Sequence, residues 1–180
     1  MTFKTEISIS DIVSVISIIL VIIGGLFGYY QWRRNVCLKR AGYINELTEK
    51  IRTDNYIRDA IYMFDYGIEW YSDDFHGSGE VESKVDKSLS YFSYICYLKR
   101  QKIITCKEFD FFKYEIERTL NNAQVKDYLY NLYHFSGQLG IPFTFKYLFE
   151  YGQKRNIFDK NFYDKEAFKK DDRYHRYLNF

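Results

Sequence analysis

The chain has 180 residues, and its 26 basic and 24 acidic side chains leave a formal net charge of only +2. Because both signs are mixed along the sequence, there is no broad basic surface of the kind that binds nucleic acids, and no DNA partner is expected. The three cysteines, an odd number without metal or redox spacing, indicate reduced thiols. Aromatic residues make up 21% of the chain, and most of them are expected to pack a core or to serve at protein interfaces.

The stretch from residue 12 to residue 32 contains no charged side chain and consists largely of Ile, Val and Leu. A bilayer core about 30 Å thick requires roughly 20 apolar residues in a helix, so this stretch is long enough to span it. Its large apolar side chains favour membrane insertion by roughly 4 to 7 kcal/mol, before the serines and glycines reduce that value. The alternatives are a buried helix of a soluble protein and a cleaved signal peptide, which would be shorter and more basic at its start.

Aromatic and basic residues at the end of this stretch form a membrane-interface signature: Tyr29, Tyr30, Trp32, Arg33 and Arg34. Aromatic rings prefer the headgroup layer, and basic residues are enriched on the cytoplasmic side of a span. Basic residues are scarce before the stretch and frequent after it. We therefore predict a short extracytoplasmic tail at residues 1–11, one transmembrane helix at residues 12–32 and a cytoplasmic helical domain at residues 33–180, in a bacterial inner membrane.

A repeated spacing of four and three residues places small or polar side chains along one face of this helix. This seam consists of Ser10, Ser14, Ser17, Val21, Gly24, Gly28 and Gln31. In lipid, little hydrophobic force draws helices together, and small residues permit the close approach that packing requires. The seam predicts that copies of the helix associate, and in a large ring its polar groups could line a lumen. Small residues are common in membrane helices, so a chance arrangement is the alternative.

Helical spacing continues through the first half of the remaining chain. Residues 33–52 are expected to continue the membrane helix or to follow it closely. Asp54 or Asn55 should cap a helix whose apolar face consists of Ile57, Ile61, Phe64, Ile68 and Tyr71. Residues 73–79 are rich in turn formers and predict a loop. A third helix is expected from about Val81 to Lys102, with an inward face of Val85, Leu89, Phe92, Ile95 and either Leu98 or Cys96.

The second half begins with a capping box, in which Thr105 and Glu108 satisfy backbone donors at a helix start. The helix that follows has an apolar face of Phe109, Phe112, Ile116 and Leu120, and Asn121-Asn122 should end it. A further helix is expected to carry Val125, Leu129, Leu132 and Phe135 and to end near Ser136. Pro142 should start a short aromatic helix at residues 143–151, and residues 164–170 are a candidate helix. Because no alternating pattern indicates a strand, the predicted fold is all-α: an N-terminal transmembrane helix followed by a compact helical bundle.

The histidines offer no catalytic or metal-binding arrangement. His76 lies in the predicted loop without visible co-ligands and is expected to be exposed, whereas His134 is expected to be packed or hydrogen-bonded in the core. His175 is expected to lie in a solvated tail. Helical ribonucleases of the HEPN kind place an arginine and a histidine at a short spacing on one helix, and no histidine here has that upstream arginine. Phosphate-loop and nucleophile-elbow motifs are also absent, so no catalytic residue, metal or cofactor is assigned.

The single N-terminal span, the segment at residues 29–34 and the Tyr/Phe-rich helical domain resemble a known group. The chain is similar, over its whole length, to small membrane accessory proteins encoded beside RNA-guided, RNA-cutting CRISPR nucleases of the type VI-B class. It is also similar to an uncharacterised bacterial family of single-span helical proteins, in segments such as residues 85–89 and 105–109. The CRISPR resemblance implies membrane pores that enhance antiviral defence, with an RNA-guided nuclease acting functionally upstream. The chain departs from the degenerate HEPN-like motif associated with that group.

Three functional hypotheses follow from these observations. The first is a homo-oligomeric pore that depolarises the membrane during infection, with membrane lipid and other copies of the chain as its contacts. The second is a membrane tether that carries a helical protein-binding module. The third is a divergent HEPN-like ribonuclease whose cleavage of RNA would depend on His134.

Overall fold

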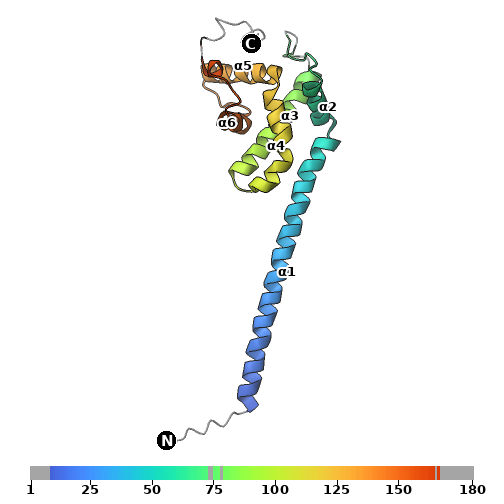
Figure 1. The fold of residues 1–180 in the computed structure, drawn as a ribbon, viewed down its shortest axis with the longest axis vertical. Coiled ribbons are helices and arrows are strands. Elements are labelled where there is room, and N and C mark those ends of the chain that lie inside the picture. Colours follow the sequence, from blue (N-terminus) through green and yellow to red (C-terminus); the bar gives the residue numbers. More distant parts are fainter. Residues whose placement is uncertain (1–8, 73–74, 78, 165, 167–180) are drawn as a thin grey trace. The chain divides into compact units, whose positions relative to one another are not determined.

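The computed structural model describes residues 9–72, 75–77, 79–164 and 166, and every regular element within these residues is a helix (Figure 1). This confirms the predicted all-α class, with a long apolar N-terminal helix followed by a helical bundle. The chain divides into two compact units, Met1–Glu46 and Leu47–Phe180. The first unit consists of most of the long helix, and the second contains the bundle.

The long helix α1 extends from Ile9 to Thr53, drawn in blue to cyan in Figure 1. Its 45 residues span about 67 Å at a rise of about 1.5 Å per residue, roughly twice the thickness of a bilayer core. The expected continuation of the apolar stretch through residues 33–52 is therefore confirmed. By length and composition α1 could cross a membrane, and the exact span at residues 12–32 stays a prediction.

The second unit is built around α3, which packs against α2, α4 and α6. In addition, α4 packs against α2 and α5. The bounds of these elements are α2 Asn55–Asp65, α3 Glu80–Arg100, α4 Cys106–Asn121, α5 Ala123–Leu139, α6 Lys146–Lys154 and the 3-10 helix η1 Lys160–Tyr163. Since most of these contacts involve α3, its side chains form the centre of the core.

Side-chain caps begin α2, α4 and α5, and the first two were predicted as caps. The Asp54 carboxylate accepts hydrogen bonds from the backbone amides of Tyr56 and Ile57, as expected for an N-cap. Thr105 and Glu108 form the predicted reciprocal capping box at the start of α4. Asn122 both ends α4 and caps α5, because its side chain accepts from the Val125 amide. Short polar side chains therefore set most of the helix boundaries that the sequence predicted.

The apolar faces expected for the central helices are buried. The set comprises Val85, Leu89, Phe92, Ile95, Cys96 and Leu98 of α3 and Phe109, Phe112, Ile116 and Leu120 of α4. The sequence left open whether Leu98 or Cys96 faces the core, and both side chains are buried there. On α5, Val125 and Leu129 are buried, whereas Leu132 and Phe135 are only half-buried. The helical spacing in the sequence therefore identified the core correctly at its centre and less well at its edge.

Some helix bounds differ from the predictions. The helix α2 ends at Asp65, before Ile68, which is exposed, and Tyr71, which is buried from the following segment. Gly67 turns the chain there with φ +61°, in the left-handed region that glycine adopts readily. Similarly, α6 begins at Lys146, three residues later than Phe143. The candidate helix at residues 164–170 lies largely outside the described residues.

Gly152 marks the closest approach inside the bundle. A methyl group at its Cα would lie 2.6 Å from the ring of Phe158. That ring is itself packed against Phe149 and Phe162, with centroids 5.3 and 4.4 Å away, so it has little room to move. Gly152 therefore allows the segment after α6 to fold back onto this helix.

We expect Gly152→Ala to destabilise the chain by about 1–3 kcal/mol, as overpacking of a core does. Gly137→Ala is the matched control, because its added methyl group would meet no atom within 4 Å in α5. The control should be neutral or stabilising by up to about 1 kcal/mol, since alanine favours helices over glycine. Urea unfolding of the full chain in mild detergent, followed by circular dichroism, measures both values. Equal effects of the two substitutions would show that the contact at Gly152 is unimportant.

Candidate functional site

All the predicted seam residues lie on α1, and all are exposed: Ser10, Ser14, Ser17, Val21, Gly24, Gly28 and Gln31. Their spacing keeps them on one side of the helix, with the gradual drift expected when a four-three repeat is placed on a 3.6-residue turn. A methyl group added at Gly24 or Gly28 would meet no atom within 4 Å. The two glycines therefore leave an open notch on the helix surface. Association through it stays a prediction.

Two of the three seam serines, Ser14 and Ser17, donate their hydroxyl hydrogen bonds within α1. The Ser14 hydroxyl donates to the Ser10 carbonyl at 2.8 Å, and the Ser17 hydroxyl donates to the Val13 carbonyl at 2.9 Å. A hydroxyl bonded in this way carries little unsatisfied polarity, so it can lie in lipid or against another helix without water. The serines therefore fit a helix–helix contact at least as well as the wall of a lumen.

The seam spacing continues beyond Gln31, which the sequence reasoning missed. Asn35, Leu38, Gly42 and Asn45 extend the same four-three repeat along the first unit, and all are exposed. The four-three repeat continues without a break past the apolar stretch, and this continuity could have identified these residues from the sequence. Asparagine at such positions fixes the register of associating helices. The face available for contact is therefore longer than the predicted seam.

The predicted membrane-interface residues follow one another on exposed turns of α1: Tyr29, Tyr30, Trp32, Arg33 and Arg34. The rings of Tyr29 and Trp32 lie on the same side, with centroids 6.1 Å apart. Such a pair presents both an apolar surface and polar tips, which is the combination enriched at the headgroup layer. Their position on one continuous helix fits the predicted role, and the interface itself stays a prediction.

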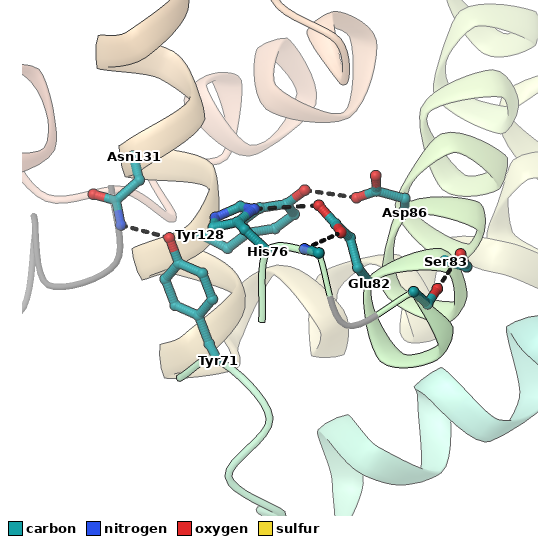
Figure 2. A network of polar contacts seen from close by, with 9 residues as sticks. Tyr71, His76, Glu82, Ser83, Asp86, Tyr128 and Asn131 are labelled. Atoms are coloured by element: carbon teal, nitrogen blue, oxygen red, sulfur yellow. Dashed lines mark hydrogen bonds and ion pairs between the residues drawn. The ribbon is translucent and has the colours of Figure 1, made fainter. Parts of the chain in front are cut away.

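In the second unit, a polar network joins the segment after α2 to α3 and α5 (Figure 2). The Tyr128 hydroxyl donates to an Asp86 carboxylate oxygen at 2.6 Å. Beside this pair, Nδ1 of His76 lies 3.2 Å from Oε1 of Glu82, whose second oxygen accepts from the Gly77 amide at 3.1 Å. Glu82 and Asp86 stand four residues apart, which places both carboxylates on one face of α3.

Aromatic rings enclose this network. The Trp70 and Phe75 ring centroids are 5.3 Å apart, and Phe75 contacts both Tyr71 and Tyr128 edge to face at 5.3 and 5.1 Å. The Gln124 side chain accepts from the amides of Trp70 and Tyr71, both at 2.8 Å. The segment after α2 is therefore held by its backbone as well as by its rings.

Burial favours the protonated forms of both Asp86 and Tyr128 in the network. Burial raises the pKa of Asp86 above its usual value, and the nearby Glu82 charge raises it too, whereas the hydrogen bond from Tyr128 lowers it. Burial also raises the pKa of Tyr128, so its hydroxyl stays a donor at neutral pH. The pair therefore acts as a brace between α3 and α5.

The histidines have structural contacts. The expectation that His76 is exposed is wrong, because its side chain is only 13% exposed and lies against Tyr71, Phe75 and Tyr128. His134 is hydrogen-bonded in the bundle as expected, since its Nε2 lies 2.8 Å from the Phe162 carbonyl oxygen. His175 lies outside the described residues. Among the described residues, no group of three or more metal-ligating side chains is brought together.

Comparisons with protein-family models, with curated proteins and with solved structures found no match for this chain.

We expect Tyr128→Phe to cost about 1–3 kcal/mol at pH 7, because the partly buried Asp86 carboxylate would lose a hydrogen bond donor. The folded pKa of Asp86 lies above its unfolded value, so its contribution to stability is present at acidic pH and is lost as the pH rises through the folded pKa. Removing the hydroxyl raises that pKa further. The cost of Tyr128→Phe should therefore be smaller at pH 4 than at pH 7 in urea unfolding.

The control is the same substitution in an Asp86→Asn background. Asparagine cannot ionise, so the cost of Tyr128→Phe should then be nearly independent of pH. An equal cost at both pH values in the native background would contradict a role for the Asp86 charge.

Proposed function

We propose that this protein is anchored in a bacterial inner membrane by residues 12–32 and that its copies assemble there through the seam of α1. The assembly forms a pore that depolarises the membrane, and its cellular role is to enhance antiviral defence downstream of an RNA-guided nuclease. The N-terminus lies outside, and the bundle lies in the cytoplasm. The main observation in support of this assembly is the open notch at Gly24 and Gly28 on an exposed apolar helix.

The exposed apolar surface of α1 supports the anchor. Every large apolar side chain from Ile12 to Phe27 is between 49% and 74% exposed. Burying one such side chain is worth about 1.5–3 kcal/mol, so leaving this whole run in water would be very unfavourable. A lipid bilayer covers such a surface on all sides at once.

The notch supports association in the membrane. Small residues let two helix backbones approach closely, and the van der Waals attraction between the helices then exceeds their attraction to lipid tails. Gly24 and Gly28 stand four residues apart with open space above both. Ile19 and Leu26 are exposed on the opposite face of the helix, so the chain offers positions both on and off the seam.

We expect Gly24→Ile combined with Gly28→Ile to reduce the oligomer to smaller species, because bulky side chains would hold the helices apart. The control, Ile19→Phe combined with Leu26→Phe, adds bulk on the opposite face of the helix and should leave the oligomer intact. Size-exclusion chromatography with light scattering in mild detergent gives the particle mass for each variant. An unchanged mass in the double variant would remove the seam from the assembly.

The pore and the tether differ in what they do to a membrane potential. The hydroxyls of Ser14 and Ser17 already donate to backbone carbonyls, so they do not require a water-filled lumen. This observation favours the tether. In vesicles that hold a potassium diffusion potential, the pore predicts dye-reported depolarisation by the native chain and not by the Gly24→Ile, Gly28→Ile variant. The tether predicts a stable potential with both chains, and full defence activity after residues 12–32 are exchanged for a monomeric span.

A further inference from the structure

A pocket between α3 and α6 lies wholly within the second unit, away from every residue assigned above. Its volume is about 410 Å³, within the range of roughly 300–1,000 Å³ that small-molecule sites occupy. It is lined by Cys96, Lys99, Arg100, Tyr147, Glu150, Tyr151, Lys154 and Arg155. Four of these side chains are basic and one is acidic, in a chain whose charges otherwise nearly balance.

Carboxylates neutralise only part of this charge. Arg100 pairs with Glu150, and both line the pocket. Nε of Arg155 lies 3.5 Å from Oε1 of Glu117, which also accepts a hydrogen bond from the Tyr151 hydroxyl at 2.7 Å. Within the part of the chain that the structure describes, no carboxylate forms an ion pair with Lys99 or Lys154.

Lys99 is the innermost of the basic groups. It is half-buried, and its Nζ lies 3.8 Å from the ring centroid of Phe109 and 5.0 Å from that of Tyr151. Burial lowers the pKa of its ammonium group, and the positive charge of Arg155 contributes to the same direction. The ring faces stabilise this charge, but their attraction is weaker than direct contact with an anion.

The remaining wall of the pocket is neutral. Burial raises the pKa of the Cys96 thiol to about 12, so it carries no charge at neutral pH. Lys99, Arg100 and Lys154 lie in the last turns of α3 and α6, where helix carbonyls favour cations. Each helix end offsets about half a charge, so the two ends leave the pocket positive.

We propose that this pocket binds a small phosphate-bearing anion, with Lys99 as its inner cation and Arg100, Lys154 and Arg155 around it. Phosphate oxygens match ammonium and guanidinium donors, and they would supply the anionic partner that Lys99 lacks among the described residues. The volume leaves room for an organic group beside the phosphate, against the Tyr147 ring. The phosphate belongs either to a soluble metabolite or to a lipid headgroup, because both present the same chemistry.

Titration calorimetry of the full chain in zwitterionic detergent, with inorganic pyrophosphate as the probe, tests this site. Lys99→Met keeps an apolar stem over Phe109 and removes the charge, so affinity should fall at least tenfold. Lys126→Gln, which removes a positive charge on α5 outside this pocket, should change affinity less than twofold. The titration is then repeated in nanodiscs with and without phosphatidylinositol phosphate. Loss of pyrophosphate binding only in the discs that contain this lipid would identify the lipid headgroup as the source of the bound phosphate.

A second substitution, which should raise rather than lower the affinity for pyrophosphate, separates an effect on binding from an effect on folding. Glu150→Gln removes the acidic side chain that lines the pocket and releases Arg100, so pyrophosphate should bind several times more tightly. A misfolded variant would not gain affinity. The proposal is overturned if the native chain binds no pyrophosphate at 1 mM in either setting, or if Lys99→Met and Lys126→Gln have equal effects. Failure of the seam variants to alter the oligomer leaves this result unaffected, because the pocket involves no residue of α1.

Discussion

The apolar surface of α1 is the constraint on which the rest of the protein depends. Between Ile12 and Phe27 each large apolar side chain is about half exposed or more. Water is a poor solvent for such a surface, so it requires lipid, other copies of the helix, or both. The bundle needs no such help, because its own aromatic and aliphatic residues bury one another around α3.

This division explains how polar and apolar residues are used in the two units. In the apolar stretch from Ile12 to Phe27 of the first unit, the only polar side chains are those of Ser14 and Ser17, and their hydroxyls bond within their own helix. In the second unit, partly buried polar groups join elements distant in sequence, as Asp86 with Tyr128 and Gln124 with the amide of Trp70 do. The bonds from Gln124 hold the backbone of the irregular segment after α2. A long exposed apolar helix with a glycine notch, joined to a bundle with its own core, suits the proposed assembly in a membrane and the proposed binding of a ligand by the bundle.

The sequence predicted the parts of the fold that local rules control. The capping box of Thr105 and Glu108 and the spacing of Phe109 to Leu120 depend on neighbours within one helix, and both were confirmed. Tyr71 is buried, as its place on the predicted apolar face implied, but it lies after α2 rather than within it. The burial of His76 was misjudged because it depends on the ring of Tyr128, which lies far away in the sequence. The pocket was invisible for the same reason, since Lys99 and Lys154 meet only when α6 packs on α3. Only the spacing of Glu82 and Asp86 gave a local hint of the network.

The central claim is that copies of α1 gather in the membrane, and images of single particles test it most directly. The full chain, extracted in mild detergent, would be imaged by electron microscopy and its particles averaged in two dimensions. The account predicts rings of several copies, with the seam of each α1 directed at a neighbour and a hole at the centre. Particles of a single copy, at concentrations where the protein is active, would contradict it.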